Sequence, residues 1–294
     1  MDRRKLDQLC TRFTLVLAIL VSLISVIIAL TAIGKSLPLF HVASLSELLF
    51  SSVWRPLEGH FGFYPFIMGT IWVTLLSMVI AIPLAILSAI YLAEYATPRI
   101  RYIFKPLIDL LAGIPSILFG LWGVLVIVPL VRNTIAPVFG VPTTGYCVLA
   151  GGIVLSIMVL PIILSLSDEL FRTVPLATKT ASFAMGATKW QTVKYVILRK
   201  TWPGILAAVI LGFSRAFGET MAVLMVVGNV AKVPGSVFDP AYPLPALIAN
   251  NYGEMLSIPL FDSALMLAAL ILFTIVVFFN IAAKVLLARF QRTV

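Results

Sequence analysis

The stretch SRAFGETMAV, residues 214–223, places an arginine and a glutamate inside a long apolar run. Arg215 and Glu219 are four residues apart, which puts both side chains on one face of a continuous helix. Each charge costs about 2.5–3.5 kcal/mol at the centre of a bilayer, whereas an ion pair at this spacing returns only about 0.2–0.5 kcal/mol. Helix stabilisation alone therefore does not explain the pair. Because a guanidinium fork matches the oxygens of phosphate-like anions, we interpret Arg215 as meeting an anion and Glu219 as neutralising that site between passages.

The neighbouring residues divide the segment 204–228 into two faces when they are placed on a helix at 100° per residue. Mostly small residues share the face of the two charges: Gly204, Ala208, Gly212, Ala222 and Val226. Bulky apolar residues share the opposite face: Leu206, Ile210, Phe213, Phe217 and Leu224. We expect the small face to meet a packed bundle interior or a water-filled cavity, and the bulky face to meet lipid. A polar lock between two helices is the alternative explanation of the charged pair.

The elements that must position this pair are membrane-crossing helices. Of the 294 residues, 61% are hydrophobic and only 11% are charged, whereas about a quarter of the residues in a soluble domain are charged. A helix needs about 20 mostly apolar residues to cross the hydrocarbon core of a bilayer. Six runs meet this requirement: 13–33, 66–92, 107–131, 145–166, 204–228 and 263–287. The sequence therefore predicts an all-α membrane protein with six transmembrane helices.

The basic residues indicate how these helices are oriented. If the N-terminus is cytoplasmic, 16 of the 21 lysines and arginines lie in segments on the cytoplasmic side. Because short cytoplasmic segments carry an excess of basic residues, this distribution predicts that both termini are cytoplasmic. Membrane topology thus accounts for the net charge of +9, and nucleic acid is not expected as a partner.

This topology gives one membrane domain, 13–287, between an N-terminal tail, 1–12, and a C-terminal tail, 288–294. Two long loops, 34–65 and 229–262, lie on the outer side. The first contains WRPLEGHFGFYPF, which is typical of a structured cap, and the second contains VPGSVFDPAYPLP, whose prolines and glycine exclude a continuous helix. Either loop has the length to receive a partner or to plug the outer mouth of the bundle, and the sequence leaves both possibilities open.

The largest cytoplasmic segment, 167–203, is polar and holds six basic residues. Its pattern predicts one helix, a break at Gly186, and a second helix that runs to Pro203. Such a pair of helices can lie on the lipid surface, held by its lysines. Alternatively, it offers a projection that another protein grips.

The chain lacks the sequence motifs of several other functions. It has no G-x-x-x-x-G-K-[ST] loop for phosphate, so it does not bind ATP by that route. Its two histidines, His41 and His60, both fall in the first outer loop, which leaves no H-E-x-x-H metal site and no histidine base within the membrane. An intramembrane hydrolase is therefore disfavoured.

Four stretches together resemble the permease subunits of bacterial phosphate ABC importers, of the PstC type: FGFYPFIMGT at 61–70, YLAEYATPRIR at 91–101, LLAGIPSILFGLWG at 110–123, and SRAFGETMAV. The resemblance extends from the first outer loop through the fifth span. It implies a six-helix, MetI-like type I permease of the bacterial cytoplasmic (inner) membrane that binds no cofactor and is not itself an enzyme. The implied partners are a PstA-type permease, two PstB-type ATPase subunits that bind ATP and magnesium, and a PstS-type phosphate-binding protein. Arg215 and Glu219 match the charged pair that this family associates with phosphate passage.

The cytoplasmic segment is similar to the coupling motif of ABC importers, E-A-A-x3-G-x9-I-x-L-P. The positions that fit this pattern are Ala181, Gly186, Val196 and Leu198. The positions that depart from it are Thr180 for the glutamate, Ser182 for the second alanine, and Arg199 for the closing proline. The resemblance therefore implies an ATPase-docking helix at this segment whose individual contacts differ from the family pattern.

Three other functions are alternatives to phosphate import. An ABC permease for another oxyanion, such as a phosphonate or molybdate, fits the same residues, and only the resemblance favours phosphate. An ion-coupled secondary transporter often has paired, inverted halves, which this sequence does not show. A purely structural membrane scaffold would explain the outer loops but leaves the charges in the fifth span without a role.

Overall fold

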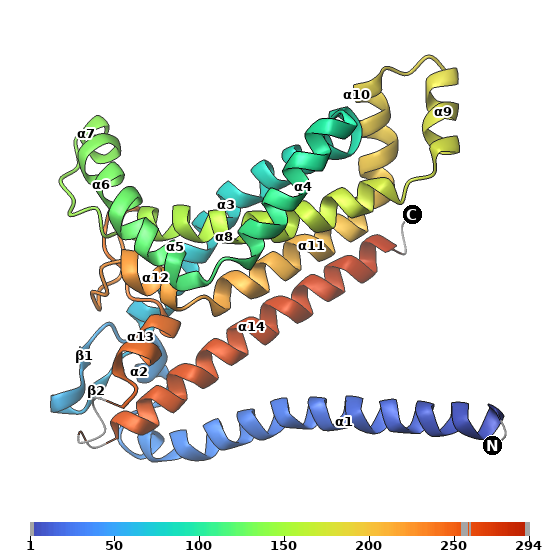
Figure 1. The fold of residues 1–294 in the computed structure, drawn as a ribbon. Coiled ribbons are helices and arrows are strands. Elements are labelled where there is room, and N and C mark those ends of the chain that lie inside the picture. Colours follow the sequence, from blue (N-terminus) through green and yellow to red (C-terminus); the bar gives the residue numbers. More distant parts are fainter. Residues whose placement is uncertain (1–2, 254–257, 259, 292–294) are drawn as a thin grey trace.

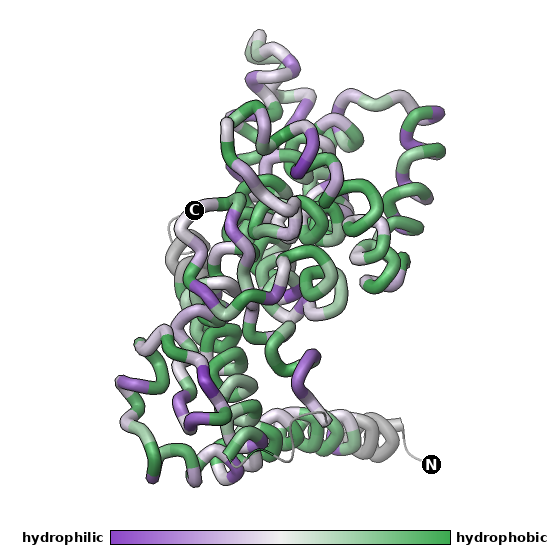
Figure 2. The backbone as a smooth tube through the Cα atoms, turned by 90° about the vertical axis from the view of Figure 1, so that its left-hand side faces the viewer, coloured by the Kyte–Doolittle hydropathy of each residue, from purple (hydrophilic) through white to green (hydrophobic). Residues whose placement is uncertain are grey.

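Six helical segments in the computed structural model are long and apolar enough to cross a membrane. The model describes the backbone of residues 3–253, 258 and 260–291, and the side chains of residues 11–253, 258 and 260–285. Within these residues the candidate spans are Thr11–His41, Tyr64–Tyr95, Ser116–Val138, Val148–Arg172, Lys189–Gly218 and Phe261–Val285. Hydrophobic residues predominate along these helices (Figure 2). The predicted six-helix, all-α membrane fold is thereby confirmed.

Helices α3, Tyr64–Ile90, and α8, Val148–Arg172, form the centre of the bundle (Figure 1). They approach closely because α8 has a glycine where α3 crosses it: a methyl group added at Gly152 would lie 2.8 Å from Leu76 Cδ2. Helix α11, Leu198–Gly218, packs against α8, and helix α14, Phe261–Gln291, packs against α11. The main core lies among these central helices.

The predicted third span, 107–131, is broken within the GIPSILFGLWG stretch. Helix α4, Pro98–Gly113, ends before Ile114, whose ψ of 129° is extended. A residue that precedes a proline is disfavoured in the helical region, so Pro115 accounts for the break. Short helical elements follow in an almost unbroken row: α5, Ser116–Trp122; η4, Gly123–Ile127; α6, Val128–Leu130; η5, Val131–Ile135; and α7, Ala136–Val138. The span therefore begins at Ser116, not at residue 107.

The first outer loop folds into a structured cap, as expected, and builds a second core. Its elements are η1, Leu37–His41; α2, Leu45–Phe50; β1, Trp54–Arg55; η2, Pro56–Glu58; and β2, His60–Phe61. Strands β1 and β2 pair antiparallel, with Trp54 opposite Phe61. The Trp54 ring lies 4.8 Å from the Phe66 ring and 6.2 Å from the Phe261 ring. The cap is thus fixed to the outer ends of α3 and α14.

The second outer loop contributes helix α13, Leu244–Asn251, to the same core. The Leu244 N–H donates to the Thr70 hydroxyl on α3 at 2.9 Å, which attaches this loop to the central helices. As its prolines predict, the stretch 233–243 contains no helix. The part of the predicted loop at 254–257 and 259 lies outside the described residues.

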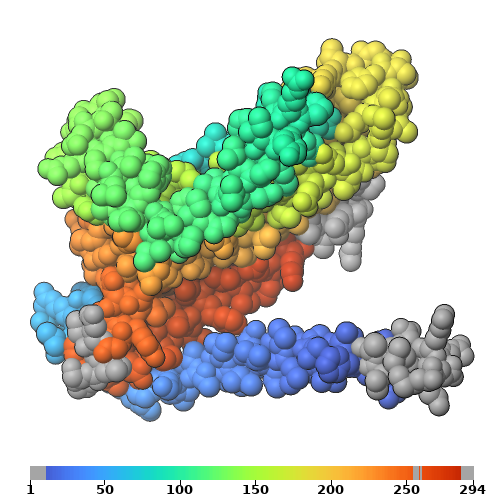
Figure 3. All heavy atoms as spheres, viewed as in Figure 1, coloured from blue at the N-terminus to red at the C-terminus, as the bar shows by residue number. Residues whose placement is uncertain are grey.

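Helix α1, Arg3–Ser36, stands away from the other helices over much of its length (Figure 3). It contacts α14, and none of its apolar window is buried. Helix α1 begins, and α14 ends, at the end of the molecule that carries α9, Leu176–Ala184, and α10, Lys189–Thr192 (Figure 1). This arrangement agrees with the predicted topology, in which both tails and the segment 167–203 share one side.

Candidate functional site

Arg215 lies on the last turn of a helix that starts at the other end of the molecule. Helix α10 continues without a break through η6, Val193–Ile197, into α11, so one helical segment runs from Lys189 to Gly218. The predicted end of the second cytoplasmic helix at Pro203 is wrong. Pro203 lies in the second turn of α11, which follows η6 directly. Arg215 and α10, the second helix of the pair in segment 167–203, are therefore parts of one helical segment, whereas α9 is separated from it by the break at Gly186.

Glu219 does not share this helix. The chain leaves the helical conformation at Glu219, with φ −72° and ψ 125°, and a second short helix, α12, runs from Met221 to Val226. The Ala222 N–H donates to Glu219 Oε1 at 3.3 Å, so the carboxylate caps the start of α12. The prediction of one helix over 204–228 with both charges on a single face is wrong. Among the described residues, Arg215 and Glu219 form no ion pair within 4.0 Å.

The small face of α11 packs against α8, and Arg215 lies at the edge of this face. Ala208, Gly212 and Ala216 are buried, and a methyl group added at Gly212 would lie 2.8 Å from Ile163 Cδ1. Arg215 itself is exposed, and its neighbour Leu211 is 52% exposed. The small face is thus a packed interior, as one of the two alternatives predicted. The guanidinium does not point into the core of this chain.

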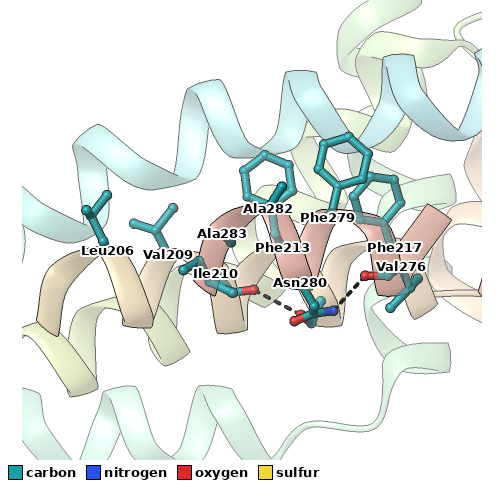
Figure 4. Close-up of a pocket in the computed structure, with 11 residues that line it drawn as sticks. Leu206, Val209, Ile210, Phe213, Phe217, Val276, Phe279, Asn280, Ala282 and Ala283 are labelled. Carbon is teal, nitrogen blue, oxygen red and sulfur yellow. Dashed lines mark hydrogen bonds between the residues drawn. The ribbon is translucent and has the colours of Figure 1, made fainter. Parts of the chain in front are cut away.

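The bulky face of α11 meets α14, and the prediction that it contacts lipid is wrong. The Phe213 and Phe279 rings stack at 6.2 Å with an interplanar angle of 8°. A pocket of about 440 Å³ lies between the two helices (Figure 4), and its lining is almost entirely apolar. The exceptions are Ser214, whose hydroxyl donates to Asn280 Oδ1 at 2.9 Å, and Asn280 itself. These contacts fix the rotation of α11, which in turn sets the direction of Arg215.

Glu219 is half-buried at the start of α12, which packs against α5. Gly120 on α5 leaves room for Met225, whose Sδ would lie 2.7 Å from an added methyl group. On another side, Glu219, Thr70 and Thr74 line a cavity of about 10 Å³, which is about the volume that one water molecule requires. The Glu219 carboxylate therefore lies between α12 and α3, whereas Gly218 is exposed and an added methyl group there would meet nothing within 4 Å.

The six residues of the predicted coupling segment separate into two groups. Thr180, Ala181 and Gly186 are exposed, whereas Ser182, Val196 and Leu198 are half-buried. Gly186 adopts a φ of +81° after α9, and its N–H donates to the Phe183 carbonyl, which ends that helix. The break at Gly186 is confirmed. Ser182 is within hydrogen-bond distance of Thr192, at 2.9 Å, and so joins α9 to α10.

Two ion-pair clusters at this end were not predicted from the sequence. Asp168, which is 2% exposed, accepts from Arg101 at 2.8 Å and from Arg172 at 3.2 Å, and the bond from Arg101 connects α8 to α4. Glu94 accepts from Lys179 at 2.6 Å. In the sequence, these ion pairs are indicated only by acidic residues close to basic segments, and that proximity does not identify which residues pair. Among the described residues, no three His, Cys, Asp or Glu side chains gather as metal ligands.

The six-helix fold is that of a transport permease. The family model of the binding-protein-dependent transport system inner membrane component matches residues 81–292, and the chain belongs to this family. A solved structure of the MetNI methionine ABC transporter, in an inward-facing conformation, has a TM-score of 0.55 and 19% identity over 78% of this chain and 94% of that one. This likeness establishes the MetI-type permease fold.

Two curated relatives are similar over most of their length. The probable ABC transporter permease protein YqgH of Bacillus subtilis (strain 168) is 38% identical over 86% of this chain and 82% of its own. The phosphate transport system permease protein PstC of Xylella fastidiosa (strain Temecula1 / ATCC 700964) is 36% identical over 84% and 80%. The resemblance to PstC-type permeases in the sequence motifs is thereby confirmed, and the chain is a multi-pass membrane subunit of a transporter.

Proposed function

We propose that this chain forms, with a second permease subunit of the PstA type, the membrane pathway of an ATP-driven importer of inorganic phosphate. The relatives named as phosphate permeases support the substrate. The observation that carries the mechanism is the unbroken helix from Lys189 to Gly218, which joins α10, the second helix of the cytoplasmic pair, to an exposed arginine.

Arg215 supplies the anion contact in this proposal. It lies at an edge of α11 that neither α8 nor α14 covers, and the second permease is the partner expected to face that edge. A guanidinium stays charged at any relevant pH and binds two oxygens of an oxyanion at once. Glu219 lies just beyond the helix end, where its negative charge offsets that of Arg215 when no anion is present.

The exposed side of the cytoplasmic helix pair supplies the surface for the ATPase. Large apolar residues are exposed there: Leu176 at 74%, Phe183 at 46%, Met185 at 88%, Trp190 at 51% and Tyr195 at 61%. Contiguous exposed apolar surface of this kind marks an interaction site. The PstB-type ATPase pair binds ATP and magnesium, and closure of that pair pushes on α9 and α10 and tilts α11. The chain itself binds no cofactor.

The remaining partners follow from the orientation. Both termini face the cytoplasm of a bacterial cell, and the protein resides in the cytoplasmic (inner) membrane, in agreement with its basic residues. The cap formed by 34–65 and the loop 229–262 then lie outside, where a PstS-type binding protein delivers phosphate. Alternating exposure of Arg215 to the two sides completes the transport cycle.

Reconstitution tests this proposal. The chain is purified with candidate permease and ATPase partners, incorporated into proteoliposomes, and supplied with binding protein and labelled phosphate. We expect accumulation that requires ATP and that unlabelled phosphonate or molybdate does not suppress. Accumulation driven by an ion gradient without ATP would establish a secondary transporter instead. Suppression of phosphate accumulation by molybdate at equal concentration would indicate that the substrate of the transporter is a different oxyanion.

A further inference from the structure

Glu94 and Lys179 form an ion pair between two segments that are 85 residues apart in the chain. The Lys179 ammonium donates to Glu94 Oε1 at 2.6 Å, and the side chains retain only 15% and 12% of their exposed surface. Exposed ion pairs hold helices together weakly. A pair enclosed by protein is screened much less by salt, so this one is a firm connection between the two segments.

The pair joins the cytoplasmic helix pair to the centre of the bundle. Lys179 lies in the middle of α9. Glu94 lies on η3, Tyr91–Tyr95, the wider helical turn that directly continues α3. Since α3 packs along the whole bundle against α8, a force applied to α9 reaches the central helices through this contact.

A second contact and a hydrogen bond make the connection rigid. The Lys189 ammonium lies 4.6 Å from the centroid of the Tyr95 ring, which fixes the start of α10 to the same turn. The Ser182 and Thr192 hydroxyls, 2.9 Å apart, join α9 to α10. Helices α9 and α10 and the end of α3 are therefore held to one another in a closed triangle.

We propose that Glu94 and Lys179 are positioning residues that transmit movement of α9 to α3, in parallel with the direct connection from α10 through α11 to Arg215. The inference rests on the proposed function, because it requires an ATPase that moves α9. If α10 were the only connection, movement of the ATPase would tilt α11 relative to α3 and α8. The second connection makes α3 follow, so that the helices on both sides of α8 move together.

The test uses the complete complex in proteoliposomes and measures ATP hydrolysed per phosphate accumulated. We expect Glu94→Gln and Lys179→Met each to raise this ratio at least about fivefold, the lower end of the usual coupling between two sites, while ATPase subunits are recovered in wild-type amounts. The double variant is expected to be no worse than the poorer single variant, since all three lack the same contact. It also contains no unpaired charge, so it decides the question if the single variants fold poorly.

Lys105→Met and Glu169→Gln are matched controls. Lys105 and Glu169 form an ion pair at the same end of the molecule, at 4.0 Å with exposures of 32% and 69%. Both variants are expected to keep the wild-type ratio.

Two results would overturn the proposal: a wild-type ratio in the Glu94→Gln/Lys179→Met variant, or loss of the ATPase subunits from that complex, which would assign the pair to docking alone. Failure of the proposed function is distinguishable, because the wild-type complex would then hydrolyse ATP without accumulating phosphate. In that case, the measurement is instead the stimulation of ATP hydrolysis by binding protein added on the outer side, because this stimulation also has to pass through the helix bundle. The double variant must lose that stimulation if the pair transmits movement.

Discussion

Arg215 and Glu219, four residues apart, lie on either side of a helix end: Arg215 is exposed on the last turn of α11, and Glu219 is extended and caps α12 through the Ala222 N–H. The two charges are therefore mechanically distinct. Arg215 belongs to the helix that reaches α10, whereas Glu219 accepts from α12 and lines a cavity with Thr70 and Thr74 of α3.

Removal of the guanidinium tests the pathway. Arg215→Leu is expected to reduce phosphate uptake by roughly 10- to 100-fold, because a hydrogen bond to a charged group contributes about 1.5–3 kcal/mol. The chain should fold as the wild type does, since Arg215 is exposed, and complex assembly is checked by recovery of the second permease subunit, which is expected to stay at the wild-type amount. The measurement is ATP-dependent uptake in proteoliposomes, with Leu211→Ala, at the same exposed edge, as the control. Normal uptake by Arg215→Leu would refute the pathway role.

Two substitutions at Glu219 separate its cap from its charge. Glu219→Gln keeps an oxygen that can accept from Ala222, so its thermal stability should stay near that of the wild type, while uptake falls because the negative charge is lost. Glu219→Ala removes both and should also lower stability by about 1 kcal/mol. Thermal unfolding of the detergent-solubilised complex and uptake are measured in parallel. Full uptake by the glutamine variant would show that Glu219 acts only as a structural cap of α12.

Substitutions at Gly186 test whether the turn after α9 contributes to docking of the ATPase. Its φ of +81° suits glycine and is tolerated by asparagine, whereas a β-branched residue is strained there by about 1–2 kcal/mol. We expect Gly186→Val to decrease the amount of ATPase subunit that copurifies, and Gly186→Asn to preserve it. Gly34→Val serves as the control, because an added side chain there meets nothing within 4 Å and Gly34 has no positive φ. Equal ATPase recovery from the valine and asparagine variants would contradict the docking assignment.

Asp168 is expected to be important for stability. Asp168→Asn leaves Arg101 and Arg172 without their shared carboxylate, which should destabilise the protein by roughly 2 kcal/mol. This figure lies below the usual loss for a fully buried pair, because the two arginines retain exposures of 26% and 38%. Asp109→Asn, at a carboxylate that is 58% exposed and 3.9 Å from Lys105, should change stability by less than about 0.5 kcal/mol. Similar unfolding temperatures for the two variants would show that the α4–α8 connection contributes little.

Much of the fold was predictable because bilayer physics acts on local sequence. Long apolar runs predicted the six spans, and Gly186 predicted the turn after α9. The break at Glu219 was not predictable from periodicity, because a glutamate can continue a helix and Gly218 alone does not end one. The extended conformation at Glu219 accompanies two contacts of its carboxylate, with the Ala222 N–H and with the cavity that Thr70 and Thr74 of α3 line, and the second exists only in the tertiary fold.

The same limit applies to the candidate site. The composition of α11 showed two faces, and of the two surroundings predicted for the small face, a packed interior or a water-filled cavity, the structure has the packed interior. The bulky face was predicted to meet lipid, since lipid and a neighbouring apolar helix such as α14 select the same residues. Ion pairs such as Glu94 with Lys179 were missed because their partners are 85 residues apart, and only the tertiary fold brings them together.

The unbroken helix from Lys189 sets the scale of the motion that transport requires. Arg215 lies about 39 Å along this rod, at about 1.5 Å per residue, so a swing of about 5° around the Lys189 end carries the guanidinium through an arc of about 3 Å. That distance is comparable to the length of one hydrogen bond. If the ATPases tilt this rod as proposed, a tilt of a few degrees is enough to make or break a hydrogen bond between Arg215 and an oxyanion, with every turn of the rod kept.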